Sequence, residues 1–230
     1  VADRVEGVLT EDAVPDPKTP YGQSKLAAEE VVRSALSRGS ALRSRFSDTV
    51  EPARSVVEPL NQAAGRLNYY ILHPCMIHGP GNKGNLNLLY GVVKKGIPWP
   101  LGAFENKRTF TSIGNLCAVI DGVLKKNVPS GIYQMADDEA LSTNELIMIM
   151  AASLGRKARI WRIPAKLIRA AARMGDTLRL PLNSERLKKL TESYVASNAK
   201  IKKALGWERM PIRARDGMRK TLESFGSNGQ

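Results

Sequence analysis

Hydrophobic residues along the chain recur either at helical spacing or in short continuous runs. Helical spacing begins at Tyr21 and continues to about Ser37, with one apolar face formed by Ala28, Val31, Val32, Ala35 and Leu36. A continuous run at 67–72 follows an Arg-, Ser- and Ala-rich segment and is typical of a buried strand. Because a helix followed by a buried strand is the repeating pattern of a parallel sheet, the predicted fold class is α/β.

The remaining sequence predicts further short strands and amphipathic helices. The strands fall at 108–112, 131–135 and 159–163, and the helices at 86–93, 113–126, 146–154, 165–174, 184–193 and 197–205. Ser142 and Glu145 have the spacing of a capping box ahead of the helix at 146–154. The C-terminal third is therefore predicted to be mostly helical, and the segment 38–66 to be an extra helix or a long surface excursion.

Tyr21 and Lys25 are the strongest candidates for catalysis. They lie four residues apart in the first turns of the predicted helix, after Pro20, and so share one helical face. A cation close to a phenol stabilises the phenolate, and the pair can then act as a general acid/base on a hydroxyl or carbonyl group. An ordinary amphipathic helix that happens to carry Tyr and Lys is the alternative.

The segment 79–84 matches the spacing G-x-G-x-x-G, which is also that of a dinucleotide-binding fingerprint, with Glu105 about 20 residues further on. In that fingerprint the acidic residue closes a second buried strand. Here the stretch from Lys94 to Glu105 contains two Lys, two Gly and two Pro, and reads as a loop. We therefore interpret the glycines as a turn that lets the backbone approach a ligand closely.

The net charge of +13, from 35 Lys and Arg against 22 Asp and Glu, indicates an anionic partner. Nucleic acid and a phosphorylated small molecule both fit that charge. The basic residues mostly alternate with apolar ones at helical spacing, which is typical of solvated helix faces, and aromatic residues make up only 6% of the chain. We therefore expect no nucleic-acid partner.

Membrane and metal-binding classes receive no support from the sequence. No apolar run approaches the roughly 18 residues that span a bilayer, and the first residues are charged rather than typical of a signal peptide. Cys75 and Cys117 each lie in an apolar run without metal-ligand spacing, so we expect two buried thiols and no metal site. These features predict a cytoplasmic protein with no membrane partner.

Several motifs follow one another in a recognisable order. Pro20–Lys25 is similar to P-Y-x-x-S-K, and His73–Gly81 is similar to R-P-x-x-V-Y-G-P-G. They are followed by Asn85 at the start of a helix, by Arg108 in a short strand, and by a Leu-Gly-Trp at 205–207. In this order the chain resembles the extended short-chain dehydrogenase/reductase (SDR) family, and most of all its nucleotide-sugar epimerases and dehydratases.

The resemblance implies two lobes. Residues 1–80, joined by 108–136, would be the remaining part of an NAD-binding Rossmann domain with a partial parallel sheet. Residues 81–107 and 137–230 would form a smaller, mostly helical lobe that binds a nucleoside diphosphate sugar. The implied cofactor is NAD, and the implied assembly is a homodimer.

The resemblance also implies a role for each candidate residue. Tyr21 would be the acid/base on a sugar hydroxyl, and Lys25 would support its phenolate and bind the nicotinamide ribose. Both would thus contact the cofactor as well as take part in catalysis. The other implied contacts are to nicotinamide, through backbone groups, from Pro74 and Cys75, and to the diphosphate from Asn85 and Arg108.

The chain departs from the family pattern at two histidines and at its start. His73 stands where the family has Arg, and His78 where it has Tyr; for both, a packed or surface histidine is at least as good an interpretation as a catalytic one. The family's Gly-rich loop would precede Val1, and its catalytic Ser or Thr would fall at or before the start of the chain. We therefore expect a fragment that by itself binds NAD weakly or not at all.

Three functions remain open from the sequence. The favoured one is an NAD-dependent 4-epimerase similar to UDP-glucose 4-epimerase, acting through a 4-keto sugar. The second is a 4-keto-sugar reductase or a dehydratase of the same family. The third is a basic, non-catalytic binding module, which the net charge would suit.

Overall fold

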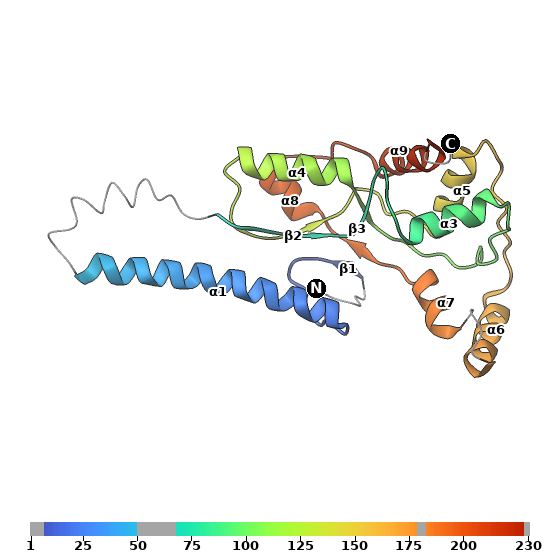
Figure 1. The fold of residues 1–230 in the computed structure, drawn as a ribbon, viewed down its shortest axis with the longest axis horizontal. Coiled ribbons are helices and arrows are strands. Elements are labelled where there is room, and N and C mark those ends of the chain that lie inside the picture. The colour runs from blue at the N-terminus through green and yellow to red at the C-terminus, as the bar shows by residue number, and fades with distance from the viewer. Residues whose placement is uncertain (1–6, 50–67, 179–182, 228–230) are drawn as a thin grey trace. The chain divides into compact units, whose positions relative to one another are not determined.

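The computed structural model describes residues 7–49, 68–178 and 183–227, which belong to two compact units (Figure 1). The small unit comprises Val1–Val5, Glu11–His73 and Pro129–Tyr133. The large unit comprises Glu6–Thr10, Pro74–Val128 and Gln134–Gln230. These boundaries differ from those of the two predicted lobes, and the assignment of one lobe to NAD and the other to a sugar stays a prediction.

The small unit contains the long helix α1, Pro20–Thr49, and most of the strand β2, Tyr70–Pro74, which pairs with β5, Gly131–Met135. The predicted end of α1 at Ser37 is wrong. The apolar stripe stops there, but the next twelve residues contain no Pro and include three Arg, one Ala and one Leu, all strong helix formers, so the helix continues to Thr49. The predicted extra helix is thus partly a continuation of α1, and 50–67 lies outside the described residues.

The large unit contains two pairs of parallel strands. β3, Met76–His78, pairs with β4, Phe110–Ser112, in register from the first residue of each strand to the last. β1, Val8–Leu9, pairs with β6, Val195–Ala196. The predicted α/β class with parallel strands is therefore confirmed, although β1 and β6 are too short for periodicity to reveal them.

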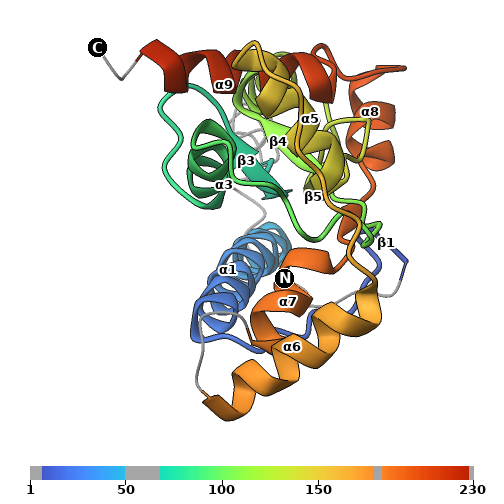
Figure 2. The same ribbon diagram turned by 90° about the vertical axis from the view of Figure 1, so that its right-hand side faces the viewer.

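The helices of the large unit agree largely with the sequence pattern (Figure 2). They are α3, Asn85–Lys94; α4, Ile113–Lys125; α5, Thr143–Ser153; α6, Ala165–Leu178; α7, Ser184–Thr191; α8, Ala199–Leu205; and α9, Ala214–Ser227. The last of these was not predicted, although its buried Ala214, Met218 and Leu222 have a spacing of four. None of the helices in the described part of the chain has the length and apolar character to cross a bilayer.

Two local predictions had different outcomes. The capping box is present, because Ser142 accepts a hydrogen bond from the backbone N–H of Glu145 while the Glu145 carboxylate accepts from the backbone N–H of Ser142. The strand predicted at 159–163 is wrong. Ile160 and Arg162 form only isolated bridges, to Trp99 and Leu101, because the partner segment is itself an irregular loop.

The core of the large unit lies where α3, α5 and α9 meet. α5 and α9 lie side by side in both views, and α3 packs against α5. The fully buried side chains at this junction include Phe110, Leu141, Ile147, Met150 and Met218. Burial of these groups is the main stabilising term, at about 1.5–3 kcal/mol for each large side chain.

Candidate active site

The predicted catalytic pair stands at the start of α1. Thr19 precedes the helix and caps it, because its hydroxyl accepts a hydrogen bond from the backbone N–H of Gly22 at 3.1 Å. Tyr21 follows Pro20 and is 73% exposed. The Lys25 ammonium lies over the phenol ring, 5.4 Å from its centroid. The structure thus brings together a phenol and a cation on one helical face, as their spacing predicted.

A buried carboxylate–histidine hydrogen bond lies farther along the same helix. Glu29 is only 9% exposed, and its Oε1 is 2.5 Å from His73 Nε2 on β2. Both residues belong to the small unit. Of the two interpretations of His73, the structure favours the packed histidine. Its hydrogen-bond partner is Glu29. Sequence reasoning did not single out Glu29, although its position, eight residues after Tyr21, places it on the helical face that carries Tyr21 and Lys25.

Pro74 and Cys75, the predicted nicotinamide contacts, begin the second segment of the large unit. Pro74 is exposed, whereas the backbone N–H of Cys75 already donates to the carbonyl of Met135 at 2.9 Å. The Cys75 thiol lies 3.2 Å from the Thr109 hydroxyl. Burial raises the pKa of this thiol above its usual value, although the hydrogen bond with Thr109 opposes the shift. Cys75 is therefore an inert packed thiol, and its contact with nicotinamide stays a prediction.

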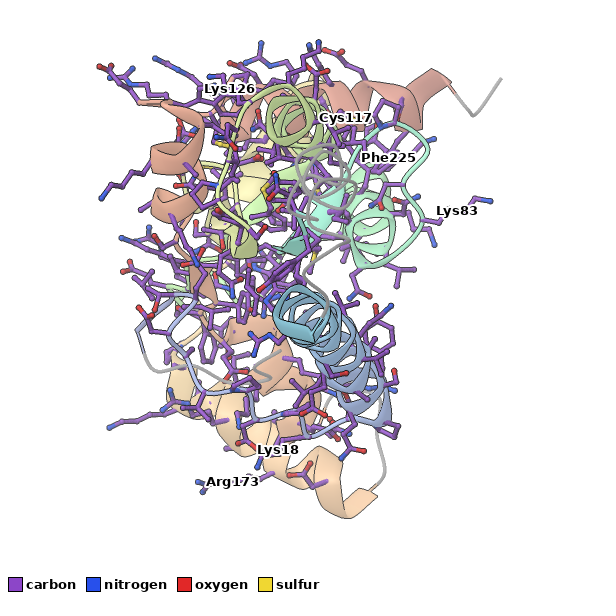
Figure 3. All side chains as sticks on the ribbon, turned by 90° about the vertical axis from the view of Figure 1, so that its left-hand side faces the viewer. Lys18, Lys83, Cys117, Lys126, Arg173 and Phe225 are labelled. Atoms are coloured by element: carbon purple, nitrogen blue, oxygen red, sulfur yellow. The ribbon has the colours of Figure 1, made fainter. Side chains whose placement is uncertain are left out.

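The two predicted buried cysteines thus differ. Cys75 is buried as expected, but Cys117 is exposed, so that part of the prediction is wrong. Cys117 lies on α4 (Figure 3), whose buried positions are Asn115, Val119, Gly122 and Val123. An apolar neighbourhood in the sequence therefore does not show which face of this helix is covered.

His78 is the other histidine that replaces a family residue, and it is part of the core. Its Nδ1 lies 2.9 Å from the Thr221 hydroxyl on α9, and its Nε2 lies 3.6 Å from a carboxylate oxygen of Asp137. Asp137 in turn accepts hydrogen bonds from the backbone N–H and hydroxyl of Ser112, and from the Asn115 amide at 2.7 Å. The packed interpretation is therefore supported, with His78 joining β3 to α9.

The glycine-rich turn lies between β3 and α3, as predicted. Gly79 closes a turn with Asn82, and a side chain at Gly79 would lie 2.5 Å from Ile113. Gly81 has a φ of +74°, and Lys83 extends outward from the turn (Figure 3). Asn85, a predicted diphosphate contact, is the first residue of α3 and is exposed. The loop that follows α3 forms isolated bridges, consistent with our rejection of a dinucleotide fingerprint.

Arg108, the other predicted diphosphate contact, is bound to α7. Its guanidinium donates to the carbonyls of Lys189 and Glu192, the latter at 3.0 Å, at the C-terminal end of that helix. Burial lowers the pKa of Arg108, while the charge of Glu192 opposes the shift. The structure therefore shows Arg108 supporting α7, and a contact with phosphate stays a prediction.

A cavity of about 390 Å³ lies beside α7 in the large unit. Its lining combines an aromatic ring, three basic side chains and two hydroxyls, from Phe104, Arg169, Arg173, Ser184, Leu187, Lys188 and Thr191. Arg169 lies over the Phe104 ring, 5.8 Å from its centroid. Aromatic and basic groups of this kind suit an anionic ligand with a flat ring. Sequence reasoning missed this site, although Arg169 and Arg173 share a helical face at a spacing of four.

Comparison with known proteins identifies the class of fold and its relatives. No protein-family model matches the chain. It is 28% identical over 157 residues to a UDP-glucose 4-epimerase from Vibrio cholerae, covering 67% of the chain and 46% of that protein. It is 27% identical over 191 residues to an N-acetyl-α-D-glucosaminyl-diphospho-ditrans,octacis-undecaprenol 4-epimerase from Escherichia coli O157:H7, covering 82% and 47%.

A solved structure agrees with these relatives. The fold matches that of a UDP-glucuronic acid 4-epimerase from Bacillus cereus in complex with NAD, with a TM-score of 0.62 at 16% identity, over 99% of the chain and 59% of that protein. The fold is thus the Rossmann type, as predicted. The curated relatives are named as sugar 4-epimerases, and two similar solved structures as a 4-epimerase and a dTDP-glucose 4,6-dehydratase, each in complex with NAD, which confirms the resemblance to this group of enzymes. The chain spans about half the length of the curated relatives it matches.

Proposed function

We propose that the gene product containing this chain is an NAD-dependent 4-epimerase of a nucleoside diphosphate sugar, with UDP-glucose as the first candidate. The observation that carries the proposal is the exposed Tyr21 phenol beside the Lys25 ammonium at the start of α1. The two curated relatives and the solved structure compared above are all named as 4-epimerases. That agreement favours epimerisation over the reductase and dehydratase alternatives.

The residues of the small unit fit the ribose end of NAD. The Lys25 ammonium carries three donors, and the contact described for it is with the Tyr21 ring rather than with a carboxylate. It can therefore bind ribose hydroxyls while its charge supports the phenolate. When bound, NAD would supply a hydride acceptor, and then a hydride donor, at C4 of the sugar.

Tyr21 handles the proton in both halves of the proposed reaction. Its phenolate takes the proton of the C4 hydroxyl as the C4 hydride leaves, which produces a 4-keto sugar. The 4-keto sugar then rotates within the site, so that the opposite face of C4 is presented to the hydride donor. Tyr21 returns the proton to the C4 oxygen as hydride is added to that face. The reaction is thus balanced in protons and electrons, with inverted C4 as the net change.

The large unit, taken by itself, holds further candidate ligand contacts. The cavity beside α7 offers Arg169, Arg173 and Lys188 to a diphosphate and the Phe104 ring to a base. Asn85 and Arg108 stay proposed diphosphate contacts, and Pro74 and Cys75 proposed nicotinamide contacts. Cytoplasmic location and a homodimer stay predictions of the sequence and of the resemblance.

The test is Tyr21→Phe in the complete gene product, assayed with UDP-glucose and added NAD. We expect kcat to fall by about 10²-fold or more, because the acid/base group is lost, with little change in KM. Tyr69→Phe is the matched control and should keep the wild-type kcat. An unchanged kcat in Tyr21→Phe would overturn the mechanism, and a dehydrated or reduced product would favour the alternative enzymes.

The binding-module alternative has its own decisive measurement. Salt-sensitive binding to generic DNA, together with thermal stability that UDP-sugars do not change, would support it. Stabilisation by a UDP-sugar, with no such DNA binding, is the result expected for an epimerase.

A further inference from the structure

Glu29 on α1 is unusual among the charged residues of this helix whose side chains are described, because its carboxylate is buried. Its side chain is 11% exposed and that of His73 19%, with 2.5 Å between Oε1 and Nε2. The adjacent Glu30, by contrast, is exposed. A buried carboxylate is stable only when it is paired, so His73 is what allows Glu29 to remain in this position.

The geometry of α1 connects this contact to the proposed catalytic pair. Tyr21, Lys25 and Glu29 follow one another at intervals of four residues, and each interval advances about 40° around the helix axis and about 6 Å along it. All three therefore lie on one stripe of the helix. Because His73 belongs to β2, the Glu29–His73 contact attaches that stripe to the strand.

We propose that Glu29 and His73 are positioning residues: their buried hydrogen-bonded contact fixes the rotation of α1 about its axis and thereby aims the Tyr21 phenol and the Lys25 ammonium. The inference rests on the proposed function for its catalytic consequence. It assigns a role to His73, the residue at which the chain departs from the family's Arg. Neither Glu29 nor His73 needs to touch substrate or cofactor.

The expected size of the effect follows from the helix radius. Side-chain tips lie about 5–6 Å from the axis, so a rotation of about 20° moves them by about 2 Å. A misplacement of about 1 Å at a reacting group can cost about 10²-fold in rate. Loss of this contact should therefore lower kcat by at least about tenfold while ground-state binding, which uses many other groups, changes little.

The kinetic experiment uses Glu29→Gln in the complete gene product with UDP-glucose and added NAD. We expect kcat per folded molecule to fall at least about tenfold with KM within about twofold. Glu30→Gln removes the same charge one residue away on the exposed face and should stay within about twofold of the wild type. All variants are assayed well below their measured Tm, so that loss of folded protein does not imitate loss of kcat.

A rescue variant separates positioning from a catalytic role of the imidazole. His73→Arg should keep kcat within about threefold of wild type, because a guanidinium binds a carboxylate through a planar fork and can replace the imidazole as the partner of Glu29. His73→Leu cannot donate a hydrogen bond to the Glu29 carboxylate and should resemble Glu29→Gln. If His73→Arg were as inactive as His73→Leu, the positioning role would be overturned.

Amide hydrogen exchange provides a readout that needs no activity. In Glu29→Gln, the amides from Gly22 to Glu29 should exchange faster than in Glu30→Gln, while those of α5 should not change. Unchanged exchange would overturn the anchoring of the helix, whatever the kinetics show. A Tyr21→Phe variant with full activity would instead overturn the proposed function alone, and the exchange result would still decide whether the Glu29–His73 contact holds α1.

Discussion

Asp138 is a hydrogen-bond acceptor that holds α8, and the segment after it, to the end of β5. Its Oδ1 accepts from the Asn198 amide at 2.8 Å and from the Lys202 ammonium at 2.6 Å. Its Oδ2 accepts from the backbone N–H of Met210 at 2.7 Å. Every donor in this arrangement points at a carboxylate oxygen, so the site is built for an ionised Asp.

Asp138→Asn places an amide N–H against a donor in either orientation of the side chain. If the amide oxygen faces Asn198 and Lys202, the amide NH₂ faces the backbone N–H of Met210, which is also a donor. If the side chain is flipped, the NH₂ faces the Asn198 and Lys202 donors instead. The variant therefore loses at least one hydrogen bond and the charge that strengthens the rest. Since a hydrogen bond to a charged group contributes about 1.5–3 kcal/mol, we expect a loss of about 2 kcal/mol at pH 7.

The pH dependence of this loss tests the reasoning more sharply than its size. Burial acts to raise the pKa of Asp138, but the bonds from Lys202, Met210 and Asn198 together outweigh it and hold that pKa below its usual value. The stabilisation is therefore fully present above the unfolded pKa of about 3.9 and is lost as the pH falls through the lower folded value.

The assay is urea unfolding of the wild type and Asp138→Asn at several pH values from 7 down to 3. The difference in free energy of unfolding should be largest at pH 7 and shrink toward pH 3. Asp121→Asn is the control, because Asp121 forms an exposed pair with Lys125 whose removal should cost less than about 1 kcal/mol. A difference of equal size at pH 7 and pH 3 would refute the reasoning.

Two further predictions concern a close backbone contact and the thiols. In Gly102→Ala the new methyl group would lie 2.4 Å from the Ile160 side chain, so calorimetry should show a loss of about 1–3 kcal/mol. A Cβ at Gly91 on α3 would meet open space, so Gly91→Ala should instead raise the free energy of unfolding by up to about 1 kcal/mol. A change of the same sign in both variants would contradict this account of the packing. With Ellman's reagent the exposed Cys117 should react quickly, whereas the raised pKa and burial of Cys75 should delay its reaction until unfolding. A rapid reaction that persists in Cys117→Ser would show that Cys75 is accessible.

The proximity of Tyr21 and Lys25 could be predicted because its geometry is local. Positions four apart on a helix share a face whatever surrounds them, so Tyr21 and Lys25 are brought together by α1 alone. The capping box at Ser142 was predictable for the same reason. The partners of Arg108 were not, because they lie about 80 residues away along the chain, on α7.

The sequence by itself determined the local elements: where most helices and longer strands lie, and the α/β class that their order indicates. Only the tertiary structure decided which face of each helix is covered. On α4 the apolar Leu124 is 76% exposed, and on α1 the apolar Val31 is exposed while the charged Glu29 is buried. The physical reason is that periodicity reports the spacing of side chains, whereas burial depends on the partner: His73 makes a carboxylate the better residue to bury on α1.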